Sequence, residues 1–151
     1  MKHLLIIVLL ALGGCSADNE TINNTTHEQT DANAVTLFPS QEMHVTFADI
    51  SNFYSETMSC MGMTAQGPNV YYKSFELYFN GAVGKSWAFF TGGTIYVNTD
   101  TIGPSFPRDR QTDEEALRHE FVHHILWANG ADWHHGDPMF AKCGLGVNTY
   151  N

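Results

Sequence analysis

The sequence has few basic residues, with seven Lys and Arg against sixteen Asp and Glu, and its formal net charge is −9. Nucleic-acid binding needs clustered cations that release counterions from the phosphates. Six of the seven basic residues are scattered between Lys73 and Lys142 among more numerous acidic residues. The charge pattern therefore argues against nucleic acid as a partner.

The sequence also lacks a long apolar run at its start. Residues 4–12 are apolar, but these nine residues are too few for a membrane-spanning helix, which needs about twenty. They are followed by Gly13-Gly14-Cys15 and then by polar sequence, so residues 1–14 are predicted to be a signal peptide. The junction resembles a bacterial lipobox, which implies lipidation of Cys15 and an exported, membrane-anchored lipoprotein. The alternative is an ordinary cleaved signal with an incidental cysteine.

In bacterial lipoproteins that this junction resembles, a Ser after the lipidated cysteine, as Ser16 here, favours the outer membrane or cell surface. Residues 15–36 contain little apolar bulk, so after the lipidated cysteine they are expected to form a flexible tether. The chain is 43 % hydrophobic and 13 % aromatic. Residues 37–151 are therefore expected to fold as one globular domain.

Cysteine is scarce, and only Cys60 and Cys143 follow Cys15. An exported protein meets an oxidising compartment, where two such cysteines are expected to form a disulfide rather than remain free thiols. The bond would connect the end of a first helix to the end of the chain.

Hydrophobic spacing predicts an α+β fold. Apolar side chains recur at helical spacing over residues 41–59, which are expected to form the first helix. Aromatic and β-branched residues mark strands, and Asn80-Gly81 and Gly92-Gly93 are turn signals between them. The expected strands are residues 70–79, 86–91 and 94–98. We therefore predict a small antiparallel sheet packed against the first helix and a second helix.

The second helix is expected at residues 112–128. Thr112 followed three residues later by Glu115 matches a capping box, and acidic residues favour the positive end of the helix dipole. Asn129-Gly130 supplies a residue that can end the helix in the left-handed conformation.

This helix carries His119-Glu120-Phe121-Val122-His123. Its two histidines are four residues apart, so they project from one helix face, one turn apart, and suit a shared metal ion. Glu120 points toward the same place at a different angle, within reach of a metal-bound water. The spacing predicts a metal chelate with a proton acceptor beside it.

Hydrolytic zinc sites usually have three protein ligands, so a third is expected downstream. No Glu follows Glu120, which excludes the Glu ligand of thermolysin-like enzymes. Leu126 and Asn129 stand where the extended metzincin motif needs Gly and His. The remaining candidates are His134, His135, Asp132 and Asp137. The two aspartates are alternatively expected to orient a ligand histidine through its other ring nitrogen.

Three further histidines are not expected to bind metal. His124 points about 100° away from His123 on a helix and is expected to be structural or exposed. His27 and His44 have no ligand partner nearby in the sequence.

The chain resembles the zincin metallopeptidases, and among them compact forms such as the SprT-like proteins. In these proteins the active-site helix is followed by His-Gly and then an aromatic residue, as His135-Gly136 and Phe140 follow here. By this likeness His135 is the third ligand, with His134 as the alternative.

The chain also looks like exported bacterial minimal zincins, in which a cysteine after that aromatic residue pairs with one at the end of the first helix. Cys143 and Cys60 occupy these positions. The chain departs from SprT-like proteins in its spacing after His-Gly and in lacking a basic surface. A role in DNA repair is therefore not implied.

The resemblance implies a zinc-dependent metallopeptidase that acts on a peptide or protein substrate, with Glu120 as the proton acceptor. It also implies that the substrate lies along an edge strand, residues 93–98. Tyr96, Tyr150 and Arg118 are candidates for stabilising the oxyanion by residue type alone. The alternatives are a non-catalytic zinc-binding surface lipoprotein and a structural lipoprotein without metal.

Overall fold

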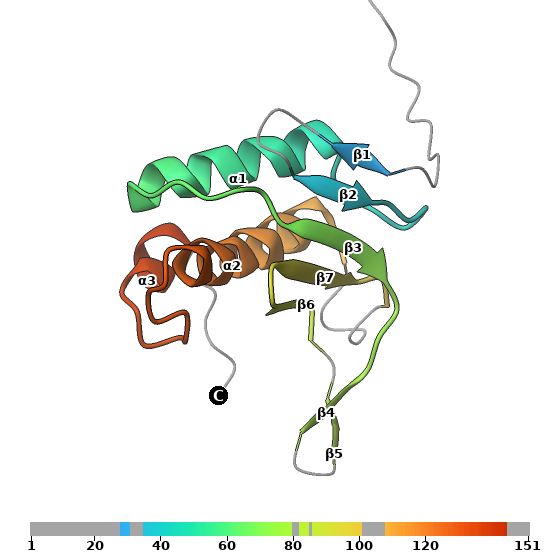
Figure 1. Ribbon diagram of the computed structural model, residues 1–151. Helices are drawn as coiled ribbons and strands as arrows, with labels where there is room; N and C mark the ends of the chain where they lie inside the picture. Colours follow the sequence, from blue (N-terminus) through green and yellow to red (C-terminus); the bar gives the residue numbers. More distant parts are fainter. Residues whose placement is uncertain (1–27, 31–34, 80–81, 85, 101–107, 145–151) are drawn as a thin grey trace, which may run out of the picture.

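The computed structural model describes residues 28–30, 35–79, 82–84, 86–100 and 108–144. The helices are α1 (Phe47–Met61), α2 (Arg110–Ala128) and α3 (Met139–Cys143). The strands are β1 (Gln29–Thr30), β2 (Thr36–Phe38), β3 (Asn69–Lys73), β4 (Leu77–Phe79), β5 (Ala82–Gly84), β6 (Ala88–Thr91) and β7 (Thr94–Asn98). The predicted α+β class is confirmed, with α1 and α2 side by side next to the main sheet (Figure 1).

The predicted signal peptide and Cys15 lie outside the described residues. Among the helices that are described, none combines the length and the apolar character needed to cross a membrane.

The main sheet is mixed, so the prediction of an antiparallel sheet is wrong. Its strand order is β1-β2-β3-β7-β6. β2, β3 and β7 pair in parallel, and only the outer strands β1 and β6 pair antiparallel with their neighbours. For β2 and β3 the reason is that α1 connects them, and a helical crossover returns the chain in its original direction. β2 has three residues, which is too short to show a hydrophobic period.

Strand β3 ends at Lys73, earlier than predicted, and β4 and β5 form a separate hairpin. This hairpin projects away from the helices and the main sheet (Figure 1). The Asn80-Gly81 turn signal lies outside the described residues. The predicted β6–β7 hairpin is confirmed, and Gly92 and Gly93 have positive φ angles of 52° and 85°, as a two-residue hairpin turn requires.

The folded domain begins within the predicted tether rather than at residue 37. β1 pairs with β2, with Gln29 opposite Leu37, and Val35 is fully buried. Such a short polar strand joins the sheet through its backbone hydrogen bonds, which composition does not reveal.

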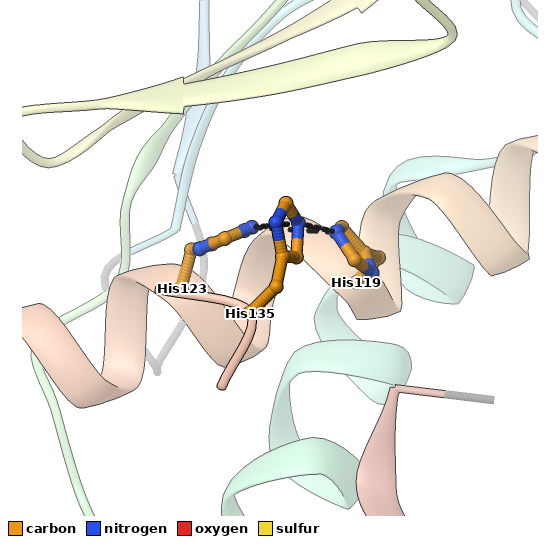
Figure 2. Close-up of side chains that lie close together, drawn as sticks. All are labelled: His119, His123 and His135. Atoms are coloured by element: carbon orange, nitrogen blue, oxygen red, sulfur yellow. Dashed lines mark hydrogen bonds between the residues drawn. The ribbon is translucent and has the colours of Figure 1, made fainter. Parts of the chain in front are cut away.

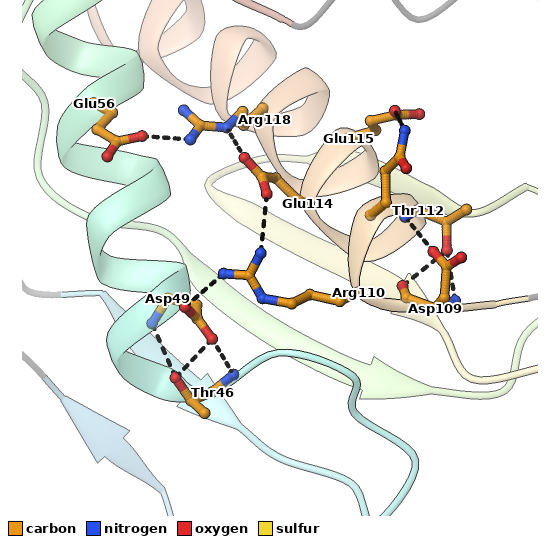
Figure 3. Close-up of polar contacts among 10 residues, drawn as sticks. Thr46, Asp49, Glu56, Asp109, Arg110, Thr112, Glu114, Glu115 and Arg118 are labelled. Atoms are coloured by element: carbon orange, nitrogen blue, oxygen red, sulfur yellow. Dashed lines mark hydrogen bonds and ion pairs between the residues drawn. The ribbon is translucent and has the colours of Figure 1, made fainter.

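Capping side chains set the starts of both long helices. Thr46 caps α1 in a capping box with Asp49, so the helix begins later than residue 41. Asp109 caps α2, with Thr112 as its partner, so the predicted capping box of Thr112 and Glu115 is wrong (Figure 3). Asp109 and Thr112 are both of a residue type that caps helices, and the path of the chain into the helix selects the earlier one.

Charged side chains connect α1 to α2 along their exposed surface (Figure 3). Arg110 pairs with Asp49 of α1 at 2.9 Å and with Glu114 at 3.6 Å. Arg118 pairs with Glu114 at 3.0 Å and with Glu56 of α1. Exposed pairs contribute little energy individually, so the network mainly aligns the two helices.

The core lies between the two long helices and one face of the sheet. Tyr54 of α1 meets Phe121 of α2 edge to face, with ring centroids 5.1 Å apart. Every residue from Glu120 to Leu126 is buried, so this part of α2 is enclosed on all sides. The other fully buried large side chains include Leu37, Ile50, Val70, Ile95, Val97 and Leu117. The fold thus buries two carboxyl groups and two histidines of α2 along with its apolar residues.

Candidate metal centre

Three histidine side chains converge beside α2 (Figure 2). The Nε2 atom of His119 lies 3.3 Å from that of His123 and 2.9 Å from that of His135, and the last two are 3.2 Å apart. Two ligands of a tetrahedral zinc ion, each about 2.1 Å from the metal, are separated by about 3.4 Å. The three nitrogens are therefore spaced to hold a metal ion.

The ring of His123 directs the lone pair of its Nε2 atom toward the rings of His119 and His135. Its Nδ1 atom lies 2.5 Å from the carbonyl oxygen of Trp133. A carbonyl oxygen only accepts hydrogen bonds, so Nδ1 carries the proton and donates it, and Nε2 is left unprotonated. Ligand histidines are usually oriented in this way. Sequence reasoning missed Trp133, because no side-chain pattern marks a backbone carbonyl.

Burial keeps the two helix histidines neutral. It lowers the pKa of His119 to about 4, and repulsion from His123 and His135 adds to the effect. Burial also lowers the pKa of His123 to about 4, although the hydrogen bond with Trp133 acts in the opposite direction. Metals bind the neutral imidazole, so at neutral pH both rings are in their ligand form.

Helix α3 covers the triad with an aromatic side chain. Phe140 is buried, and its ring centroid lies 5.1 Å from that of His119, 4.5 Å from His123 and 5.2 Å from His135. An apolar neighbour of this kind limits water access and ring rotation at a metal site. The predicted disulfide is confirmed, since Cys143 of α3 is bonded to Cys60 in the last turn of α1.

Glu120 directly follows His119 in α2 and is 6 % exposed. It is not part of the group of side chains that converge on the three nitrogens. Burial raises the pKa of Glu120 to about 8, and a hydrogen bond with the Phe90 backbone of β6 opposes the shift. A cation held by the histidines would lower this pKa, because it favours the carboxylate.

The structure brings His135, and not His134, to the two helix histidines. His134 is exposed, and its Nδ1 atom lies 2.6 Å from a carboxylate oxygen of Asp132. Asp137 accepts the backbone N–H of Met139 at 2.8 Å at the start of α3. The expectation that these aspartates orient a ligand histidine is therefore wrong, because their carboxylates are used by local turns.

The remaining histidines are outside the triad. His124 is buried, and its Nε2 atom lies 2.7 Å from the carbonyl oxygen of Gln66, which fits the structural role expected for it. His44 is exposed. His27 lies outside the described residues.

The described candidates for oxyanion stabilisation are engaged in other contacts. Arg118 is held between Glu114 and Glu56. The ring of Tyr96 is stacked between those of Tyr71 and Phe89, at 5.5 Å and 4.8 Å. Side chains alternate along a strand, and the neighbours Ile95 and Val97 face the core, so Tyr96 lies on the opposite face of the sheet. Tyr150 lies outside the described residues.

The expectation that residues 93–98 form an edge strand is also wrong. β7 pairs with β3 on one side and with β6 on the other, which places β6 at the edge of the sheet. The hairpin turn pairs one side of β7 with β6, and the other side of β7 pairs in parallel with β3.

Comparisons with family models, with curated proteins and with solved structures each found no match to this chain.

Proposed function

We propose that this protein is a zinc-dependent metallopeptidase that hydrolyses peptide bonds in a peptide or protein substrate. The observation that carries the proposal is the convergence of His119, His123 and His135. Glu120, which stands between the two helix histidines in the sequence, is buried. Imidazole nitrogens suit zinc, and three protein ligands leave a position open for water, as in hydrolytic sites.

In the proposed mechanism the three histidines would bind zinc, and Glu120 would transfer the proton. Zinc held by the three histidines would supply an acidified water and polarise the scissile carbonyl. Glu120 would accept a proton from that water and deliver it to the leaving amine. Its pKa is raised to about 8 in the metal-free protein, and a bound cation would lower it. A group that both accepts and donates a proton works best when its pKa lies near the working pH.

The exposure of the triad favours a large substrate. His135 is exposed to solvent, and His119 is partly exposed. A pocket of about 580 Å³ beside the β6–β7 turn is lined by His124 and Trp127, among others, and by none of the three histidines. An ion bound on the exposed His135 side of the triad would be within reach of a bond in an extended polypeptide.

Replacing Glu120 by Gln tests the proposal, since Gln keeps the size of the side chain but cannot take a proton. We expect one bound zinc per chain in the parent protein and in Glu120→Gln. We also expect the variant to cleave a fluorescence-quenched unfolded protein about 100- to 10,000-fold more slowly.

Two histidine variants provide the controls for this assay. His134→Ala should keep both zinc and cleavage, and His135→Ala, which retains two ligands, should bind zinc more weakly and lose cleavage. Equal cleavage by the parent and Glu120→Gln would refute the role of Glu120. A parent protein without stoichiometric zinc would refute the metal site itself.

A non-catalytic zinc-binding surface protein is the second candidate. The contacts that occupy Arg118 and Tyr96 favour it, because the described part of the chain then offers neither of these side chains to an oxyanion. Stoichiometric zinc without cleavage in the parent protein would support this alternative over the peptidase.

We further propose that the protein is exported and anchored by a lipid on Cys15. The disulfide between Cys60 and Cys143 supports export, because such bonds persist in oxidising compartments. Cys15→Ser should move the protein from the membrane fraction to the soluble fraction. A parent protein found in the soluble fraction would contradict the anchor.

A further inference from the structure

The third histidine of the triad is held differently from the other two. His119 and His123 belong to α2, where helical hydrogen bonds and burial fix them. His135 is exposed and lies in the stretch between α2 and α3, residues 129–138, which contains neither helix nor strand. Its position therefore depends on the hydrogen bond that His123 donates to the Trp133 carbonyl and on what holds the two ends of this stretch.

The near end is held by the end of α2. The backbone N–H of Ala131 donates to the carbonyl oxygen of Leu126 at 2.9 Å, and Gly130 adopts the left-handed conformation with φ 67°. These bonds are local, so they remain whatever happens at the far end.

The far end is held by α3, which has five residues and is too short to be stable as an isolated helix. Two of its side chains, Phe140 and Cys143, are buried. Phe140 lies against the three histidine rings, and Cys143 is bonded to Cys60 of α1 across 83 residues of sequence. The disulfide thus links the far end of this stretch covalently to α1.

We infer that the Cys60–Cys143 disulfide positions His135 as the third metal ligand, so that metal affinity depends on this bond. The inference rests on the proposed metal site. Without the disulfide, α3 is held to the core by non-covalent contacts alone, such as those of Phe140, and more of the ordering of His135 must occur when the metal binds. With it, the ordering is already complete, and the ion meets three ligands held in place.

The dependence couples metal capture to thiol oxidation. Two thiols form the disulfide by exchange with a small disulfide such as oxidised glutathione, which takes up the two electrons and two protons and leaves as two thiols. The dithiol form binds metal weakly and the disulfide form tightly. A chain with this property acquires its metal after it reaches an oxidising compartment.

The test compares zinc affinity, measured by competition with a chromophoric chelator, in the parent protein and in Cys60→Ser/Cys143→Ser. Variants are used rather than reductants, because thiol reagents bind zinc themselves. We expect the double variant to bind zinc about 10- to 100-fold more weakly, the range found when groups that support ligands are removed. Cys60→Ala/Cys143→Val, which keeps apolar volume at the buried Cys143, replaces it if the serine variant does not fold.

The same substitutions in a His135→Ala background show whether the disulfide acts through His135. There, loss of the disulfide should change the affinity for zinc by less than about twofold. Thr46→Ala serves as the matched control, because it weakens the cap of α1 without touching residues 129–143. It should leave zinc affinity unchanged.

Three outcomes would overturn the inference. The first is equal zinc affinity with and without the disulfide. The second is an equal loss in the His135→Ala background, which would mean that the disulfide acts on the whole fold. The third is absence of zinc binding in the disulfide-bonded parent protein, which alone would also refute the proposed metal site.

Discussion

Replacing Asp113 by Ala should destabilise the fold severely, because the carboxylate is the partner of a buried cation. Arg108 contacts it through two nitrogens, Nε and Nη2, each 2.9 Å from a carboxylate oxygen. The side chains of Arg108 and Asp113 are 4 % and 1 % exposed. Asp113 also accepts the backbone N–H of His44 at 3.2 Å. One carboxylate thus satisfies donors from two separate segments of the chain.

The magnitude follows from what the substitution leaves behind. Arg108 cannot lose its proton, so Asp113→Ala leaves an uncompensated charge in the interior. Breaking a buried pair in this way costs about 3 to 5 kcal/mol, a large part of the roughly 5 to 15 kcal/mol that stabilises a typical domain. Arg110 offers a matched comparison, since it is 58 % exposed and pairs with Asp49 at the same distance, 2.9 Å. Arg110→Ala should cost less than about 1 kcal/mol.

Urea unfolding followed by circular dichroism measures both free energies of unfolding. A third variant, Arg108→Met/Asp113→Leu, removes both charges and should recover most of the loss caused by Asp113→Ala. The reasoning is refuted if Asp113→Ala costs no more than Arg110→Ala. It is also refuted if Arg108→Met/Asp113→Leu is as unstable as Asp113→Ala.

Two further predictions concern pH and metal. Burial tends to raise the pKa of Asp49, but hydrogen bonds from Thr46 and Arg110 outweigh it and lower the pKa below its ordinary value of 3.8. The ionised carboxylate therefore stabilises the fold at pH values above about 4, and this contribution is lost as the pH falls further. In urea unfolding, the advantage of the parent protein over Asp49→Asn should shrink between about pH 6 and about pH 3, and a constant difference would contradict the pKa shift. Zinc at 100 times its dissociation constant should raise the free energy of unfolding of the parent protein by about 2.7 kcal/mol. The variant His119→Ala/His123→Ala should show no such increase, and an equal increase in both proteins would place the zinc elsewhere.

Helix α2 and its two histidines could be predicted because their determinants are local. Four-residue spacing places His119 and His123 on one face of any helix, and the structure shows both rings directed to one point. Even so, the helix begins at Arg110, before the expected Thr112. Asp109 and Thr112 both match the pattern of a cap, and only the direction in which the chain enters the helix distinguishes them.

The choice between His134 and His135 was not decided by residue type or spacing. Adjacent residues outside a helix or strand can point in either direction, so the outcome depends on the conformation of residues 129–138. In the structure, His134 bonds to Asp132 and His135 faces the helix histidines. Phe140 and the disulfide of Cys143 complete that arrangement from α3.

The α+β class, the helix with His119 and His123, the β6–β7 hairpin and the pairing of Cys60 with Cys143 could all be predicted from local signals and from residue counts. Helical spacing and turn residues act over a few positions, and only Cys60 and Cys143 remain as partners if Cys15 is lipidated. The direction of the central strands, the edge position of β6 and the carbonyl that orients His123 depend on the tertiary structure. These features arise from contacts between segments far apart in the chain. Many of these contacts are backbone hydrogen bonds, which nearly every residue type can make, so no side-chain pattern marks them.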